Sequence, residues 1–190
     1  DALALDRPTG DITETEAMTE AECVDHFVFG MGAVTDGTDV LCLGEMGIGN
    51  TTTAAAVAMA LFGGNATAWT GAGTGVSGKA LEKKTEIVRD AVKLHIKTPS
   101  DPFDVLRCLG GRELAAIAGA VLAARFRRVP VMLDGYVATA AAAVLEANHP
   151  GALDHCQVGH VSTEPGHRKL LEKLEKEPLL DLSLRLGEAT

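Results

Sequence analysis

Several features that would indicate other kinds of protein are scarce or missing in this 190-residue chain. Its four cysteines, Cys23, Cys42, Cys108 and Cys156, form no CxxC pair, which is typical of reduced thiols in the cytosol. Aromatic residues make up only 4%, so we expect no aromatic cage around a planar ligand. The 17 basic residues are outnumbered by 26 acidic ones, which argues against a nucleic-acid binder. The longest uncharged apolar run, 114–124, is shorter than the ~20 residues of a membrane span.

What the chain does contain is enough apolar material for a core. Hydrophobic residues make up 46% of it, and its length predicts a single α/β domain over residues 1–190. No basic segment leads into an apolar run near the start, so we expect no secretory signal and a cytoplasmic protein. Because it begins at Asp1 and ends within a glycine turn, we expect a fragment of a longer protein.

Helical and strand patterns alternate along the chain. Apolar spacing and capping signals predict helices over 20–32, 51–62, 77–97, 102–109, 112–127, 136–148 and 168–177. Apolar runs predict strands at 39–43 and 129–133, shorter strands at 66–70 and 158–161, and an apolar helix or strand over 179–190. This alternation predicts a doubly wound (Rossmann-like) parallel sheet with helices on both faces. Ligands of such sheets bind beyond the carboxyl ends of the strands.

Glycines cluster at two of the predicted strand–helix junctions. The segment 44–52, GEMGIGNTT, combines backbone N–H groups with a helix N-terminus, which suits an anion. It lacks the lysine of an ATP-binding loop, and Thr52 stands where a dinucleotide loop has its third glycine, so a monophosphate is favoured. A tight turn capped by Asn50 or Thr51 is the alternative. The segment 71–75, GAGTG, repeats the pattern, and a plain turn explains it equally well.

Three further polar segments follow predicted strands or end the chain. Asp134-Gly135 could bind ribose hydroxyls or cap the next helix. The loop 162–167 offers a hydroxyl, a carboxylate and an imidazole to a ligand, and the alternative is a plain β-turn. Glu188, next to a glycine, could form an acid–base pair with Glu45, although glutamates in such positions are often merely solvated.

Metal and hydrolase sites are disfavoured. His155, Cys156, His160 and His167 have spacings that match no common zinc site, so we expect no metal. Ser162 and His167 lack a nucleophile elbow, which argues against a catalytic triad.

Taken together, the motifs GEMGIGNTT, GAGTG, GGREL, LDGY, STEPGH and LRLGEAT resemble one family in order and approximate spacing. It is the nicotinate-nucleotide:dimethylbenzimidazole phosphoribosyltransferase family, whose members build the nucleotide loop of cobalamin. The resemblance implies a doubly wound sheet and a cytoplasmic homodimer. It also implies that the family's N-terminal part, which supplies much of the benzimidazole pocket, and its C-terminal helix are absent from this chain.

Carried onto this sequence, the resemblance implies Glu188 as catalytic base and Glu45 as an auxiliary carboxylate at the reacting centre. It implies a nicotinate mononucleotide site formed by Gly47, Ile48, Gly49, Asn50, Thr51, Gly73, Thr74, Gly75, Asp134, Gly135, Ser162, Leu186 and Gly187.

The implied reaction is a pentosyl transfer from nicotinate mononucleotide to 5,6-dimethylbenzimidazole, giving α-ribazole 5′-phosphate and nicotinate. It requires no cofactor, because nicotinate leaves a pyridinium glycoside with its own lone pair. The alternatives are a fragment that binds nicotinate mononucleotide without catalysis, and an unrelated phosphate-binding enzyme such as a small-molecule kinase.

Overall fold

The structure, a computed structural model, describes residues 8–96 and 101–184. Its sheet has four parallel strands in the order β1 (Leu41–Leu43), β2 (Val131–Leu133), β3 (Cys156–Ser162) and β4 (Pro178–Leu184). Leu43 lies opposite Leu133, which lies opposite Val158, so the carboxyl ends of the first three strands share one edge of the sheet. The pairing of β3 with β4 shifts register between His160 and Ser162.

Eight helices are found within these residues. They are α1 (Glu20–Met31), α2 (Asn50–Phe62), α3 (Ala66–Trp69), α4 (Lys79–His95), α5 (Pro102–Leu109), α6 (Arg112–Arg127), α7 (Tyr136–Asn148) and α8 (Pro165–Lys173). Thr19 and Glu22 form the predicted capping box of α1, and Asp101 caps α5 with proline in the first turn.

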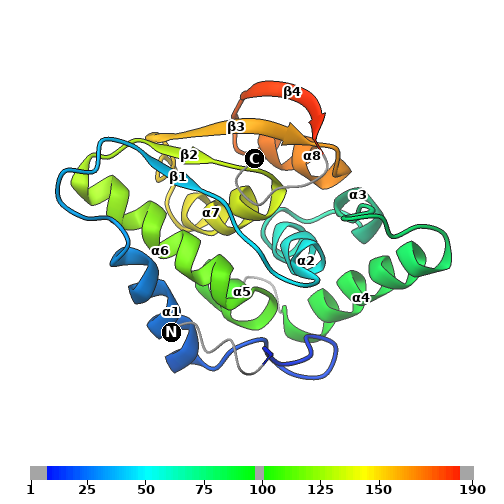
Figure 1. Cartoon of the computed structure of the whole chain (residues 1–190). Helices are drawn as coiled ribbons and strands as arrows, with labels where there is room; N and C mark the ends of the chain where they lie inside the picture. The colour runs from blue at the N-terminus through cyan, green and yellow to red at the C-terminus, as the bar shows by residue number, and fades with distance from the viewer. Residues whose placement is uncertain (1–7, 97–100, 185–190) are drawn as a thin grey trace.

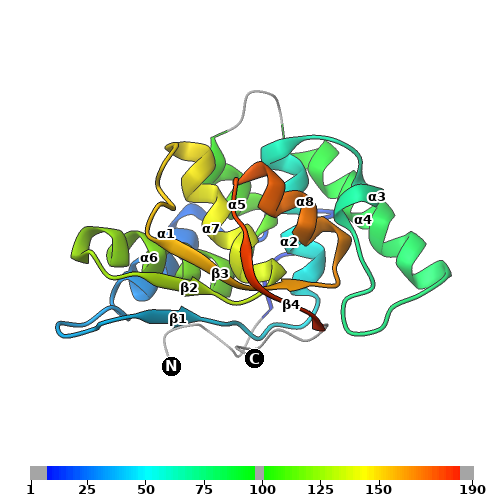
Figure 2. The ribbon, with the colours of Figure 1, turned by 90° about the horizontal axis from the view of Figure 1, so that it is seen from above.

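The helices of the described residues cover one face of the sheet (Figure 2). The strand order follows the chain order, and right-handed crossovers between strands in such an order place every connecting helix on the same side. A doubly wound sheet needs a reversal of strand order, which the four strands lack. The α/β class and the parallel sheet are confirmed, whereas the expected second helical layer is not present in residues 8–96 and 101–184.

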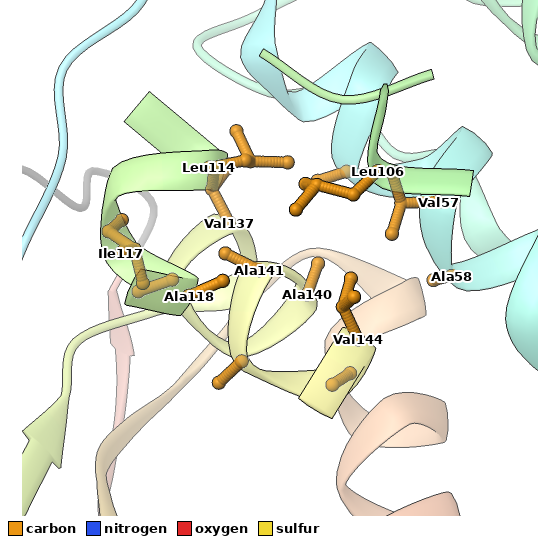
Figure 3. Packing of buried hydrophobic residues seen from close by; sticks show 14 of the residues in the cluster. Val57, Ala58, Leu106, Leu114, Ile117, Ala118, Val137, Ala140, Ala141 and Val144 are labelled. Carbon is orange, nitrogen blue, oxygen red and sulfur yellow. The ribbon is translucent and has the colours of Figure 1, made fainter. Parts of the chain in front are cut away.

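The core lies between the sheet and an outer layer of helices. Helix α7 is buried over most of its length because it packs against α2, α5 and α6 (Figures 1 and 3). Small side chains such as Ala118, Ala140 and Ala141 allow these helices to approach closely (Figure 3). Helices α1 and α6 touch backbone to backbone, since a methyl group on Gly119 would lie 1.9 Å from the carbonyl oxygen of Phe27.

One predicted element is wrong, and others are longer or shorter than predicted. The segment 66–70 is the short helix α3, because the Asn65 side chain accepts the Ala68 N–H at 2.9 Å and starts a helical turn. The strands predicted at 39–43 and 129–133 are shorter, and β3 is longer than the predicted 158–161. Helix α8 begins at Pro165, three residues earlier than predicted, and the described part of 179–190 belongs to a strand.

All four cysteines are free thiols, as their spacing predicts. Burial raises the pKa of Cys23 to about 11 and that of Cys156 to about 12, so both remain protonated near neutral pH. No helix of the described residues is long and apolar enough to cross a bilayer.

Candidate functional site

The predicted loops meet at the carboxyl edge of the sheet. The Asp134 N–H, directly after β2, donates to the carbonyl of Leu43 at 3.1 Å, where β1 ends and the first glycine loop begins. Strand β3 continues beyond Val158, the partner of Leu133, and ends at Ser162. The site therefore has loops that leave three neighbouring strands and lead into α2, α7 and α8 (Figure 1).

The first glycine loop delivers an uncapped helix N-terminus to this edge. Gly49 is the N-cap of α2 in a left-handed conformation with φ of 80°, which only glycine adopts without strain. Neither Asn50 nor Thr51 is the cap, so the predicted cap is wrong, whereas the alternative of a tight turn without a ligand stays open. No side chain of the N-cap satisfies the first N–H groups of α2, and Ile48 beside it is fully exposed. This arrangement leaves backbone donors and the positive end of the helix dipole available to an anion.

Asn50 holds the predicted acid–base residue of this loop. Its side-chain amide donates to the carboxylate of Glu45. Asn50 also hydrogen-bonds to Glu113 in the first turn of α6, a residue that the site prediction lacked. Burial raises the pKa of Glu113, and the hydrogen bond from Asn50 partly opposes that rise. Asn50 thus links two carboxyl groups beside one strand end.

A cavity of about 480 Å³ lies next to these groups. It is lined by the exposed side chains of Met46 and Ile48, by Asn50, and by Glu113 and the glycines before α6. A methyl group on Gly47 would lie 2.7 Å from a Glu113 oxygen, so the loop packs directly on that carboxyl.

The second glycine loop lies against the first. Lys84 on α4 donates from Nζ to Thr51 Oγ1 and to the Gly71 carbonyl, each at 2.8 Å. Gly73 has a φ of 54°, and a methyl group there would lie 3.0 Å from Thr51 Oγ1. The ammonium of Lys84 therefore joins the two loops, with Thr74 and Gly75 following at the exposed end.

Lys84 is a functional candidate that the site prediction missed. It is 8% exposed, and burial lowers its pKa. A signal existed in the sequence, because Lys84 lies three residues after Leu81 and four before Val88, on the apolar stripe of its helix.

Asp134 lies in the buried part of the site. It is 8% exposed, and its Oδ1 lies 3.4 Å from Nδ1 of His160 on β3. The N-cap position of α7 is taken by Gly135. A small cavity of about 160 Å³ opens beside Asp134 and His160 on the sheet.

His167 connects the second and third strand ends. Its Nδ1 accepts the Ser162 N–H at 2.9 Å, so its Nε2 carries the proton and donates to Thr139 Oγ1 at 3.1 Å. Thr139 in turn donates to the Gly135 carbonyl at 2.8 Å. Burial, with the nearby charges of His160 and Arg168, lowers the pKa of His167 to about 3.

These contacts concern two kinds of site that the sequence disfavours, a catalytic triad at Ser162 and His167 and a metal site. Both ring nitrogens of His167 are engaged, and Ser162 Oγ accepts the Glu164 N–H at 3.2 Å. Within the described ranges no three acidic, cysteine or histidine side chains gather in a way that could hold a metal ion.

The contacts above thus bring predicted residues of both glycine loops, of the Asp134-Gly135 segment and of the end of β3 toward one edge of the sheet. Leu186, Gly187 and Glu188 lie outside the described residues.

Comparison with known proteins gives matches over nearly the whole chain. A family model described as "Phosphoribosyltransferase" matches residues 1–190. Curated relatives named nicotinate-nucleotide--dimethylbenzimidazole phosphoribosyltransferase are 63% identical in Brucella canis and 62% identical in Brucella melitensis biotype 2, over 188 residues. The match covers 99% of this chain and 56% of each relative, so the chain spans about half their length.

A solved structure matches as well. The crystal structure of CobT from Thermus thermophilus is 41% identical with a TM-score of 0.90, over 95% of this chain and 55% of that one.

Proposed function

Because the chain belongs to the nicotinate-nucleotide:dimethylbenzimidazole phosphoribosyltransferase family, we propose that it forms the α/β part of such an enzyme. The enzyme transfers the 5-phosphoribosyl group of nicotinate mononucleotide to 5,6-dimethylbenzimidazole and releases nicotinate. Since the curated relatives carry the name of the complete transferase, catalysis is favoured over binding alone.

The observation that supports a site for the 5′-phosphate of the mononucleotide is the buried ammonium of Lys84. Among the described residues it uses two of its three N–H donors, on Thr51 and Gly71, so one remains for a substrate oxygen. The uncapped N-terminus of α2 supplies backbone donors and positive potential beside Thr51. A 5′-phosphate held between the two glycine loops would satisfy both. Thr74, Gly75, Asp134, Gly135, Ser162, Leu186 and Gly187 would surround the rest of the nucleotide.

Glu45 would then face the reacting carbon. A benzimidazole nitrogen attacks C1′ of the ribose from the face opposite nicotinate, which converts the β-linkage to α. Nicotinate takes the electrons of the broken bond onto its positively charged ring nitrogen, so it needs no proton. Asn50 fixes the direction of the Glu45 carboxylate, whose negative charge stabilises the positive charge that develops at C1′.

The attacking base must lose the proton on its other nitrogen. We assign that proton to Glu188 as general base, because it is the carboxylate of the family motif LRLGEAT. The main tasks of the protein are therefore to hold the phosphate, to align two rings and to accept one proton. None of these steps requires a metal or a cofactor.

The remaining assignments concern the whole protein. We propose that residues 1–190 are one α/β nucleotide-binding domain of a longer, cytoplasmic chain that acts as a homodimer. Other segments would complete the benzimidazole pocket, next to the exposed Met46 and Ile48.

A product assay tests the proposal on the full-length protein. Nicotinate and α-ribazole 5′-phosphate should form in equal amounts when nicotinate mononucleotide and dimethylbenzimidazole are both present. Nicotinate release that does not depend on the benzimidazole, or binding without any release, would contradict the transfer reaction.

A further inference from the structure

Glu164 is a buried carboxylate that the mechanism above does not use. It precedes α8 and is 6% exposed. Its Oε1 accepts the N–H of Gly73 at 2.6 Å, so it holds the second glycine loop directly. Its Oε2 has no hydrogen-bond partner in the part of the chain that the structure describes. A buried carboxylate with an unsatisfied oxygen is costly, which indicates a role beyond packing.

Lys84 and Glu164 hold the same loop. Lys84 donates to the carbonyl of Gly71, and a methyl group on Gly71 would lie 2.5 Å from Glu164 Oε2. A methyl group on Gly73 would lie 3.4 Å from Lys84 Nζ. The cation and the carboxylate therefore both border the segment from Gly71 to Gly73, where we placed the phosphate.

The charge of Lys84 depends on this neighbour. Burial lowers the pKa of Lys84, and the negative charge of Glu164 raises it. The helices α2 and α3, which pack on α4, contain no ionisable residue.

Several other charged groups on or near α4 are paired with one another, and Glu164 is the one charge that is found to act on Lys84 within the described residues. On α5, Arg107 pairs with Glu16 at 3.0 Å and with Asp104 at 3.2 Å. On α4 itself, Lys83 pairs with Glu86 in solvent at 3.7 Å. Glu164 is thus the group whose charge acts on Lys84.

We propose that Glu164 is a positioning residue of the mononucleotide site, which fixes the second glycine loop and keeps the buried ammonium of Lys84 charged for the phosphate. The inference rests on the proposed function, and Glu164 acts on the phosphate through Lys84. Glu164 itself does not touch the phosphate, since two anionic groups would repel each other.

The proposal predicts in which direction the affinity for the mononucleotide changes with pH when the charge of Glu164 is removed. Lys84 attracts the phosphate only when it is protonated. Without the charge of Glu164 its pKa falls further, so the ammonium is lost at a lower pH. The 5′-phosphate remains a dianion from pH 7 to pH 9, because its second pKa is about 6. Weaker binding at pH 9 would therefore report on Lys84 rather than on the ligand.

The experiment compares Glu164→Gln with the wild-type full-length protein. Calorimetric titration with nicotinate mononucleotide gives a dissociation constant for each protein at pH 7 and at pH 9. Glutamine keeps an oxygen for the Gly73 N–H and removes the charge. We expect the ratio of the variant's constant to the wild-type constant to rise severalfold between pH 7 and pH 9, because the variant loses the ammonium of Lys84 at a lower pH than the wild type does.

Two further variants separate charge from shape. Glu164→Asp keeps the charge, so its ratio should be the same at both pH values even where its affinity is lower throughout. Glu172→Gln, on an exposed position of α8, should match the wild type at both. The Asp variant also keeps the proposal testable if Glu164→Gln does not fold, since a pH-dependent ratio for it contradicts the charge argument.

The outcomes distinguish this inference from the proposed function. A wild-type protein that binds no nicotinate mononucleotide at either pH refutes the proposed function, and the inference with it. A wild-type protein that binds, together with a Glu164→Gln ratio that is equal at pH 7 and pH 9, overturns the positioning role alone.

Discussion

Acid should destabilise this fold through one buried histidine. His167 is 0% exposed, and its pKa falls from 6.5 to about 3 because burial penalises the charged ring. Between these two values only the unfolded chain binds the proton. The free energy of unfolding is therefore fully retained above pH 6.5 and declines as the pH falls from 6.5 toward 3.

The size of the effect follows from the two pKa values. A pH of 5 lies 1.5 units below 6.5, the pKa of His167 in the unfolded chain, so the unfolded histidine is protonated. It lies above the folded value of about 3, so the folded histidine is still neutral. At about 1.36 kcal/mol per unit, His167 alone lowers the free energy of unfolding by about 2 kcal/mol between pH 7 and pH 5.

Urea denaturation measures this loss, with the fluorescence of Trp69 as the signal. Trp69 is the single tryptophan and is 0% exposed, so its emission reports on unfolding of the core. His167→Gln cannot titrate, so its stability should fall by about 2 kcal/mol less over the same pH range than that of the wild type. His149→Gln, at an exposed position, should keep the wild-type dependence. Parallel pH profiles for the wild type and His167→Gln would refute the reasoning.

Three further predictions concern the site. Glu188→Gln should lower nicotinate release by a factor of about 10²–10⁴ while calorimetry shows nucleotide affinity within a few fold of wild type, and undiminished turnover contradicts the assignment of the base. Lys84→Met should weaken nicotinate mononucleotide about tenfold or more but not the phosphate-free riboside, with the exposed Lys93→Met as control; equal losses for both ligands oppose a phosphate contact. Gly49→Val should weaken mononucleotide binding, because the valine side chain would cover the N-terminus of α2. Gly37→Val is the control for backbone strain, since Gly37 has a similar φ of 84°. Equal dissociation constants of the two variants for the mononucleotide would contradict the prediction.

Local signals predicted the helices well because each had a distinct cause. The capping box at Thr19, the Asp101-Pro102 start of α5 and the apolar run of α6 all appear where expected. The segment 66–70 was mistaken for a strand because its few apolar residues suit both structures, and the Asn65 cap decided between them.

Contacts between segments that are distant in the sequence could not be predicted from local patterns. Glu164 lies 91 residues from the Gly73 N–H that it accepts, and no local pattern reports such a pairing. His167 was grouped with possible ligands, yet its buried contacts with Ser162 and Thr139 make it a link between loops. Its neutral state depends on burial, which spacing alone does not reveal.

The arrangement of helices shows the same limit. Alternating strands and helices predict a parallel sheet but leave the strand order open. The consecutive order of β1 to β4 places the described helices on one face (Figure 2).

A crystal structure of the full-length protein with nicotinate mononucleotide bound tests the central claim most directly. The account predicts the 5′-phosphate within hydrogen-bonding distance of Lys84 Nζ and of backbone N–H groups at the start of α2, with Glu45 and Glu188 facing C1′ of the ribose. A phosphate bound away from both glycine loops, or the two glutamates on opposite sides of the molecule, would contradict it.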